Sequence, residues 1–166
     1  SSTMKIQNLN KSAAEPQHLT TYWPWLLLAL AQPLSVNAQA LPDERSFAEG
    51  ASLLMTYGTN IHGLLDRGHA KAGETMLVLG AAGGVGIAAI ELGKALGLRV
   101  VAAVSSQEKA DFCKSVGADE AVVYPRGPLD RDQQKALSAA FKDAVGKDGA
   151  NIVYDIIGGD YADPAI

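Results

Sequence analysis

Cysteine and histidine are scarce in this chain of 166 residues, which contains one cysteine, Cys113, and three histidines. A single cysteine cannot form a disulfide within the chain. Structural zinc sites take four Cys or His ligands, mostly Cys, so the sequence predicts no metal site. Because Cys113 follows Phe112 in a helical pattern, we interpret it as a small buried hydrophobic residue rather than a reactive thiol.

An excess of positive charge is also lacking. The chain has 14 Lys and Arg against 18 Asp and Glu, for a net charge of −4, and the basic residues are scattered. A nucleic acid or an anionic membrane surface would require a basic patch, so neither is expected as a partner. Any basic contact to a phosphate must therefore be local.

A membrane-spanning hydrophobic run is missing, since residues 23–31 form an apolar run too short to cross a bilayer. This run and the small residues ending at Ala40 imitate a secretory signal, but the preceding segment is long and Pro24 and Pro33 interrupt the pattern. We therefore leave residues 1–40 as an unassigned N-terminal extension, packed on the domain or disordered. We expect a cytoplasmic protein, with secretion and cleavage after Ala40 as the alternative. The charged residues of the extension are Lys5, Lys11 and Glu15.

From Leu41 onward, short apolar runs alternate with helical stripes and glycine-rich turns. Runs buried on both faces are typical of parallel strands. Right-handed crossovers between them predict a doubly wound, Rossmann-type α/β fold over residues 41–166, with strand order 3-2-1-4. A complete fold of this type has two further strands, so the sheet is expected to be incomplete. The predicted strands are 75–80, 99–104, 121–124 and 151–155.

Helices are predicted before and between these strands. Residues 46–67 have apolar residues at helical spacing, and Gly58 is expected to divide them into two helices. Ser105 and Glu108 fit a capping box for a helix that runs to Val116. A further helix, expected to be capped by the segment that begins at Asp130, precedes the fourth strand.

The first strand leads into a glycine-rich loop, residues 80–86, that opens a helix. It matches G-x-G-x-x-G with Ala81 in place of the first glycine, in a βαβ unit of about 30 residues. Gly83 lets the backbone approach a pyrophosphate, and Gly86 lets the helix lie close to the strand. The free N–H groups and the dipole of the helix favour the negative charge. The residues assigned to this phosphate cradle are Ala82, Gly83, Gly84 and Val85.

The end of the second strand indicates which dinucleotide binds. NAD-binding domains usually carry an acidic residue there, about 20 residues after the glycines, and a carboxylate would repel the 2′-phosphate of NADP. This chain has no acid at that point. Ser105, Ser106 and Lys109 instead lie within one turn of the helix start and suit a phosphate. The sequence thus favours NADP(H). The alternative is that Ser105 only caps the helix and Lys109 is a solvated lysine.

These motifs together resemble the zinc-independent quinone oxidoreductases of the medium-chain dehydrogenase/reductase superfamily. The resemblance covers roughly residues 38–163. A cysteine zinc ligand of the zinc-containing relatives is absent, because this chain has Glu-Gly-Ala-Ser at 49–52. The segments that carry the resemblance are 56–59, 73–74, 78–86, 94–97, 105–109, 117–119 and 153–155.

The resemblance implies hydride transfer from NADPH to a quinone, enone or related carbonyl compound. Ser106, Lys109 and Tyr124 match the family positions around the 2′-phosphate, although Tyr124 could also be a simple edge-strand aromatic. Thr59 matches a position near the nicotinamide half. The GroES-like substrate domain of the family has no counterpart in residues 1–37, so no catalytic residue can be assigned.

Two functions therefore stay open. The first is the cofactor-binding part of an NADPH-dependent reductase with a small quinone or enone-like substrate. The alternative is a nucleotide-binding module or truncated form without turnover, so whether this chain is an enzyme by itself is left undecided. His62 is interpreted as a helix-surface or core residue rather than a general acid. The missing strands would leave an open sheet edge, which predicts a homo-oligomer or self-association.

Overall fold

The computed structural model describes residues 47–166. The signal-like run and the rest of the predicted N-terminal extension lie outside this range. The described chain contains one parallel sheet of four strands in the order β3-β2-β1-β4, which confirms the predicted topology. Leu79 at the end of β1 lies beside Ala103 and Asp155, so the strands end along one common edge. The strands are β1 (Thr75–Leu79), β2 (Arg99–Val104), β3 (Glu120–Val123) and β4 (Ile152–Asp155).

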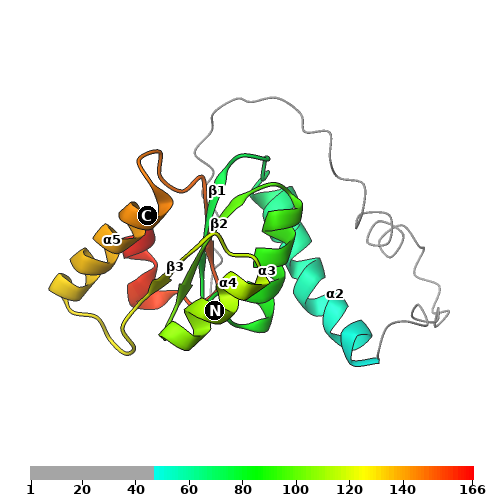
Figure 1. Ribbon diagram of the computed structural model, residues 1–166, viewed down its shortest axis with the longest axis horizontal. Coiled ribbons are helices and arrows are strands. Elements are labelled where there is room, and N and C mark those ends of the chain that lie inside the picture. The colour runs from blue at the N-terminus through cyan, green and yellow to red at the C-terminus, as the bar shows by residue number, and fades with distance from the viewer. Residues whose placement is uncertain (1–46) are drawn as a thin grey trace.

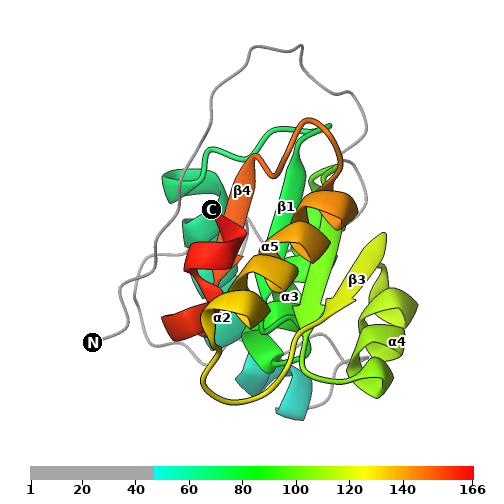
Figure 2. The ribbon, with the colours of Figure 1, turned by 90° about the vertical axis from the view of Figure 1, so that its left-hand side faces the viewer.

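Helices cover both faces of the sheet, as Figures 1 and 2 show. One face carries α3 and α4, with α2 packed outside α3, and the other carries α5 and the C-terminal 3-10 turns. The helical elements are α2 (Phe47–Ile61), the π-helix η1 (His62–Arg67), α3 (Gly84–Ala95), α4 (Gln107–Val116), α5 (Arg131–Val145), η2 (Gly159–Tyr161) and η3 (Asp163–Ala165).

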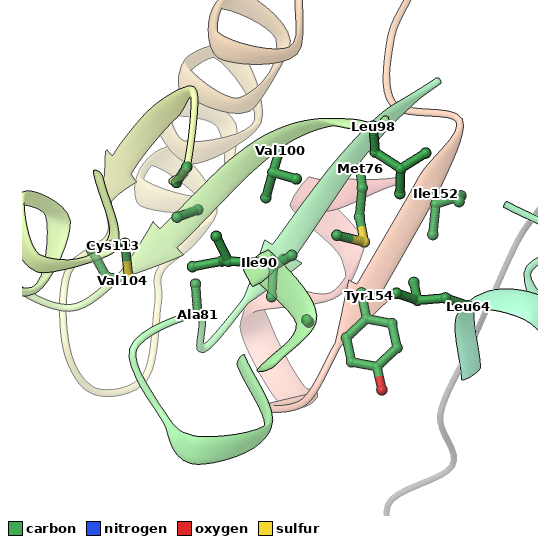
Figure 3. Close-up of a cluster of buried hydrophobic side chains, with 14 of the residues drawn as sticks. Leu64, Met76, Ala81, Ile90, Leu98, Val100, Val104, Cys113, Ile152 and Tyr154 are labelled. Carbon is green, nitrogen blue, oxygen red and sulfur yellow. The ribbon is translucent and has the colours of Figure 1, made fainter. Parts of the chain in front are cut away.

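The strands are apolar on both faces because both faces are covered. Met76 and Val78 of β1 belong to the cluster under α3 and α4, which Figure 3 shows. Leu77 and Leu79 point the other way, into the cluster under α5. All four side chains are at most 1% exposed. At about 1.5–3 kcal/mol for each large aliphatic side chain removed from water, these two clusters are the main stabilising contribution of the fold.

Gly58 does not divide the first helix, contrary to the sequence prediction. Helix α2 continues through it to Ile61 and passes directly into the π-helical turn of η1. A glycine inside a helix costs only about 1 kcal/mol, which the docking of α2 on α3 outweighs. The change of helix type occurs where Gly63 lies against Tyr154, since a Cβ at Gly63 would be 2.9 Å from Tyr154 Cε2.

Two helix starts test the predicted caps. Asp130 caps α5 as predicted, and a full capping box joins it to Gln133, with N–H···O distances of 2.8 and 3.0 Å. The predicted cap at Ser105 is wrong by one residue. Ser106 is the N-cap of α4, and its Oγ accepts a hydrogen bond from Lys109 N at 3.4 Å. The hydroxyl of Ser105 is thereby available for other contacts.

Candidate functional site

The glycine loop reverses the chain tightly at the end of β1. Gly80 has φ +75°, a left-handed conformation that favours glycine. The N–H groups of Gly80 and Ala81 both donate to Ala103 O, at 3.0 and 3.2 Å, and Gly83 N donates to Gly80 O at 3.1 Å. The loop is therefore held against β2 by its own backbone before α3 begins.

The last two glycines of the motif differ in what surrounds them. A Cβ on Gly86 would lie 2.5 Å from Ala81 O and 2.6 Å from Ala81 C, so only glycine lets α3 start this close to the strand end. A Cβ on Gly83 would meet only Gly80 O, at 3.5 Å, and Gly83 is exposed. Gly86 thus serves helix–strand packing, whereas Gly83 leaves an open approach to the backbone.

The first turn of α3 can accept an anion at this approach. The first N–H of α3 that has an acceptor in the helix is that of Ile87, which donates to Gly83 O at 2.8 Å. The N–H groups of Gly84 and Val85 come before it in the chain and so have no acceptor within the helix. Within residues 47–166 no acidic side chain lies in the first turn of α3. The positive end of the helix therefore faces solvent next to an uncovered glycine, which is the arrangement that a phosphate requires.

A small hollow beside the loop brings together residues from the ends of three strands. Lys109 reaches into it from α4, and its Nζ lies 3.4 Å from Ser105 Oγ. Ser106 does not line the hollow, since its hydroxyl caps α4. The residues that line the hollow are Gly80, Ala82, Gly83, Val104, Ser105, Lys109 and Tyr124.

Tyr124 forms the β3 side of the hollow and is 8% exposed. Its ring packs on Tyr161, with centroids 4.7 Å apart and planes at 46°. Burial and the neighbouring Tyr161 raise the pKa of the Tyr124 hydroxyl, and the positive charge of Arg126 opposes them. The hydroxyl therefore stays protonated at neutral pH and can donate a hydrogen bond to a phosphate oxygen.

Thr59 lies apart from the hollow, on α2. Its Oγ1 donates to Met55 O at 2.6 Å, one turn back in the same helix. Of the predicted site residues, the hollow brings together Ala82, Gly83, Ser105, Lys109 and Tyr124. It does not include Thr59, Gly84, Val85 or Ser106.

Asn60 is a buried polar residue that the sequence analysis missed. It is fully buried, and its Nδ2 donates to Thr56 O at 2.7 Å and to Val85 O at 2.9 Å, so it ties α2 to the first turn of α3. A second tie joins the Tyr57 hydroxyl to the Glu91 carboxylate. The sequence signal that could have indicated this buried residue is an asparagine on the helix face whose other residues pack inward.

Other reactive side chains of the described region are placed in structural roles. His62 is exposed and pairs with Asp66, with Nδ1 2.9 Å from Oδ2. Cys113 is fully buried, and burial raises the pKa of its thiol, which keeps it protonated and confirms its interpretation as a core residue. Residues 47–166 contain no cluster of His, Cys, Asp or Glu able to hold a metal ion, and no helix long and apolar enough to cross a membrane.

Comparison with known proteins matches this arrangement to a family. The family model described as zinc-binding dehydrogenase matches residues 84–166, half of the chain. Quinone oxidoreductase-like protein 2 of Bos taurus is 38% identical over 125 residues, which cover 75% of this chain and 34% of that protein.

Two solved structures support the same relationship. Mycobacterial Rv1454c complexed with NADPH has a TM-score of 0.66 and 31% identity, over 75% of this chain and 36% of its own. CurK enoyl reductase has a TM-score of 0.60 and 27% identity, over 76% of this chain and 36% of its own. The chain spans about a third of the length of these relatives. It belongs to the zinc-binding dehydrogenase family, as a quinone-oxidoreductase-type member of the medium-chain dehydrogenase/reductase superfamily.

Proposed function

We propose that residues 41–166 bind NADP(H) and form the cofactor-binding part of a reductase whose acceptor is a quinone or an enone-like carbonyl compound. The observation that carries this proposal is the hollow at the ends of β1, β2 and β3, where the glycine loop, Ser105, Lys109 and Tyr124 meet. The NADPH complex of the mycobacterial relative and the names of the quinone and enoyl reductases support it. The bound nicotinamide supplies the hydride.

The chain's own residues bind and orient the coenzyme in this proposal. The N–H groups of Gly84 and Val85 hold the pyrophosphate at the start of α3, with Ala82 and Gly83 giving the backbone approach. Ser105, Lys109 and Tyr124 offer two hydroxyls and an ammonium group to the 2′-phosphate. Ser106 acts indirectly, because its hydroxyl holds Lys109 N in the cap. Thr59 is assigned to the nicotinamide side.

Binding and turnover are tested separately, because they distinguish the two candidate functions. Calorimetry with NADPH measures binding, and consumption of NADPH with a soluble quinone measures turnover. We expect binding in the micromolar range or tighter. Binding with turnover supports the reductase, whereas binding without turnover favours a nucleotide-binding module. Absence of NADPH binding would refute both.

Lys109→Ala should weaken NADPH binding by roughly ten- to a hundredfold and leave NADH nearly unchanged, since only NADPH has the phosphate that receives a charge-assisted hydrogen bond. Ser105→Asp should reduce the preference further by repelling the phosphate. Titration of both coenzymes measures the effect. Lys135→Ala is the matched control, because Lys135 is exposed on α5 outside the hollow. An equal loss for both coenzymes would place the phosphate elsewhere.

We also propose that the chain self-associates through β4. Among the described residues, β4 pairs with β1 along one edge and with no strand along the other. Ile156 and Ile157, which follow β4, are exposed. Unpaired strand edges recruit other chains, so sedimentation should show dimers or larger species whose fraction rises with concentration. A monomer at every concentration tested would argue against this contact.

A further inference from the structure

We infer that Arg126 is a second cation of the 2′-phosphate site and that Tyr161 is the positioning residue that presents it. This inference rests on the proposed function and names the source of its phosphate specificity. Neither residue is part of the glycine loop or of the Ser105, Ser106 and Lys109 group. Tyr161 packs on Tyr124, which lines the hollow, and Arg126 follows Tyr124 by two residues.

Tyr161 holds the backbone on both sides of Arg126. Its hydroxyl lies 3.0 Å from Pro125 O and 3.1 Å from Gly127 O and can donate to either. Tyr161 in η2 therefore restrains the backbone just before and just after the arginine, at Pro125 and Gly127. The ring of Tyr161 at the same time packs on Tyr124, with centroids 4.7 Å apart. A single side chain thus packs on Tyr124 and restrains the backbone that carries Arg126.

The rest of the loop is also restrained. Asp160 Oδ2 accepts a hydrogen bond from Leu129 N at 2.9 Å, which ties the far end of the loop to the same 3-10 turn. Pro125 and Pro128 have restricted φ angles, and Gly127 has φ +96°. The segment that carries Arg126 is therefore preorganised, which reduces the entropy lost when the arginine binds a ligand.

The charge of Arg126 acts on the site and is available to a ligand. Its positive charge stabilises the ionised form of Tyr124 and so opposes the rise in the pKa of that hydroxyl. Arg126 itself is exposed. Within residues 47–166 neither Arg126 nor Lys109 forms an ion pair with a carboxylate. Two cations without a carboxylate partner, Lys109 in the hollow and Arg126 two residues after Tyr124, are suited to a dianionic phosphate, and a guanidinium can bind two of its oxygens.

The contact of Tyr161 with the loop after β3 joins two segments that follow opposite edges of the sheet. Strands β3 and β4 are the opposite edges of the sheet, yet η2 follows β4 and contacts the loop after β3. The loop after β3 and the turns after β4 therefore meet on the α5 face of the sheet, and Figure 2 shows that loop running below the sheet toward the red C-terminal turns. The 2′-phosphate side thus depends on chain that lies about 35 residues beyond Tyr124.

The test measures dissociation constants for NADPH and NADH with the full chain and its variants. Arg126→Gln should weaken NADPH by roughly tenfold and NADH by less than twofold, since an exposed charge-assisted contact is at the weaker end of its range. Arg67→Gln is the matched control, because Arg67 is an exposed arginine of η1 outside the hollow. It should change neither constant. The NADPH loss should shrink as salt rises, because screening weakens exposed charges.

Tyr161→Phe tests the positioning role, since it keeps the ring and removes only the hydroxyl. It should weaken NADPH by roughly threefold and leave NADH unchanged. In the double variant with Arg126→Gln, the two losses should not add, because the hydroxyl acts through the arginine. A purely structural role would reduce both coenzyme affinities together. Circular dichroism would confirm that each variant is folded, so that the dissociation constants of folded chains are compared.

The outcomes separate this inference from the proposed function. A ratio of NADPH to NADH affinity that is the same in Arg126→Gln as in the unaltered chain would overturn the inference and leave the proposed function standing. Additive losses in the double variant would overturn the role of Tyr161. An unaltered chain that binds no NADPH, or binds NADH equally well, would overturn the proposed function and this inference with it.

Discussion

Gly83→Val is expected to abolish NADP(H) binding while the fold stays intact. Gly83 is exposed, its backbone has the extended angles φ −82° and ψ 168°, and an added Cβ would meet only Gly80 O at 3.5 Å. The valine side chain therefore has room in the protein when no coenzyme is bound. Its isopropyl group would occupy the approach through which the pyrophosphate must reach the N–H groups of α3, and those charge-assisted hydrogen bonds would be lost.

Two measurements on this variant are needed together. Calorimetry with NADPH should show at least a hundredfold weaker binding, corresponding to loss of about 3 kcal/mol. The urea midpoint should remain within experimental error of the unaltered chain. Gly127→Val is a useful comparison, since Gly127 also has open space around it but has φ +96° and should lose stability through backbone strain. Unchanged NADPH affinity in folded Gly83→Val would contradict the assignment of the loop.

Gly86→Ala is expected to give the opposite result, with a large loss of stability. A methyl group there would lie 2.5–2.6 Å from the O, C and Cα atoms of Ala81. These are backbone atoms between a buried strand end and α3, so they cannot rotate away as a side chain can. Helix α3 must move off the sheet or its first turn must unwind. Overpacking of this kind costs on the order of 3 kcal/mol, a large fraction of the free energy of unfolding of a small domain.

Urea denaturation of Gly86→Ala measures this effect, with Gly58→Ala as the control. Gly58 lies inside α2, and no atom is within 4 Å of its added Cβ. The same substitution should therefore stabilise α2 by about 0.5–1 kcal/mol. If Gly86→Ala unfolded at the same urea concentration as the unaltered chain, this result would contradict the close packing of α3 on the end of β1.

Local sequence patterns predicted the strands, because a strand buried on both faces needs an unbroken apolar run. The run Arg99–Val104 was located at its observed bounds, and the other three were within one residue. Handedness of crossovers then determined the sheet order, which the structure confirms. The glycine loop was predictable for a similar reason, since the role of Gly86 depends on residues only five positions away.

Helix boundaries were harder to predict, because neighbouring residues offer nearly equivalent choices. Ser105 and Ser106 can both cap α4, and only the end of β2 at Val104 and the start of α4 at Gln107 decide between them. At Gly58 a weak local preference for a break is outweighed by the packing of α2 on α3. The effect of Gly58 on α2 thus depends on α3, whose sequence begins more than twenty residues later.

Local patterns in the sequence predicted the α/β class and the strand order, which the structure confirms, and they are the basis of the phosphate-binding role proposed for the loop. Each follows from burial patterns, backbone chirality and glycine geometry, which act over a few residues. Only the tertiary structure decided that Asn60 ties α2 to Val85 and that Tyr161 clamps the loop of Arg126. These contacts join residues 25 to 36 positions apart. Such a contact forms only after folding has brought both segments together, so a local pattern can mark a residue such as Asn60 but does not name its partner.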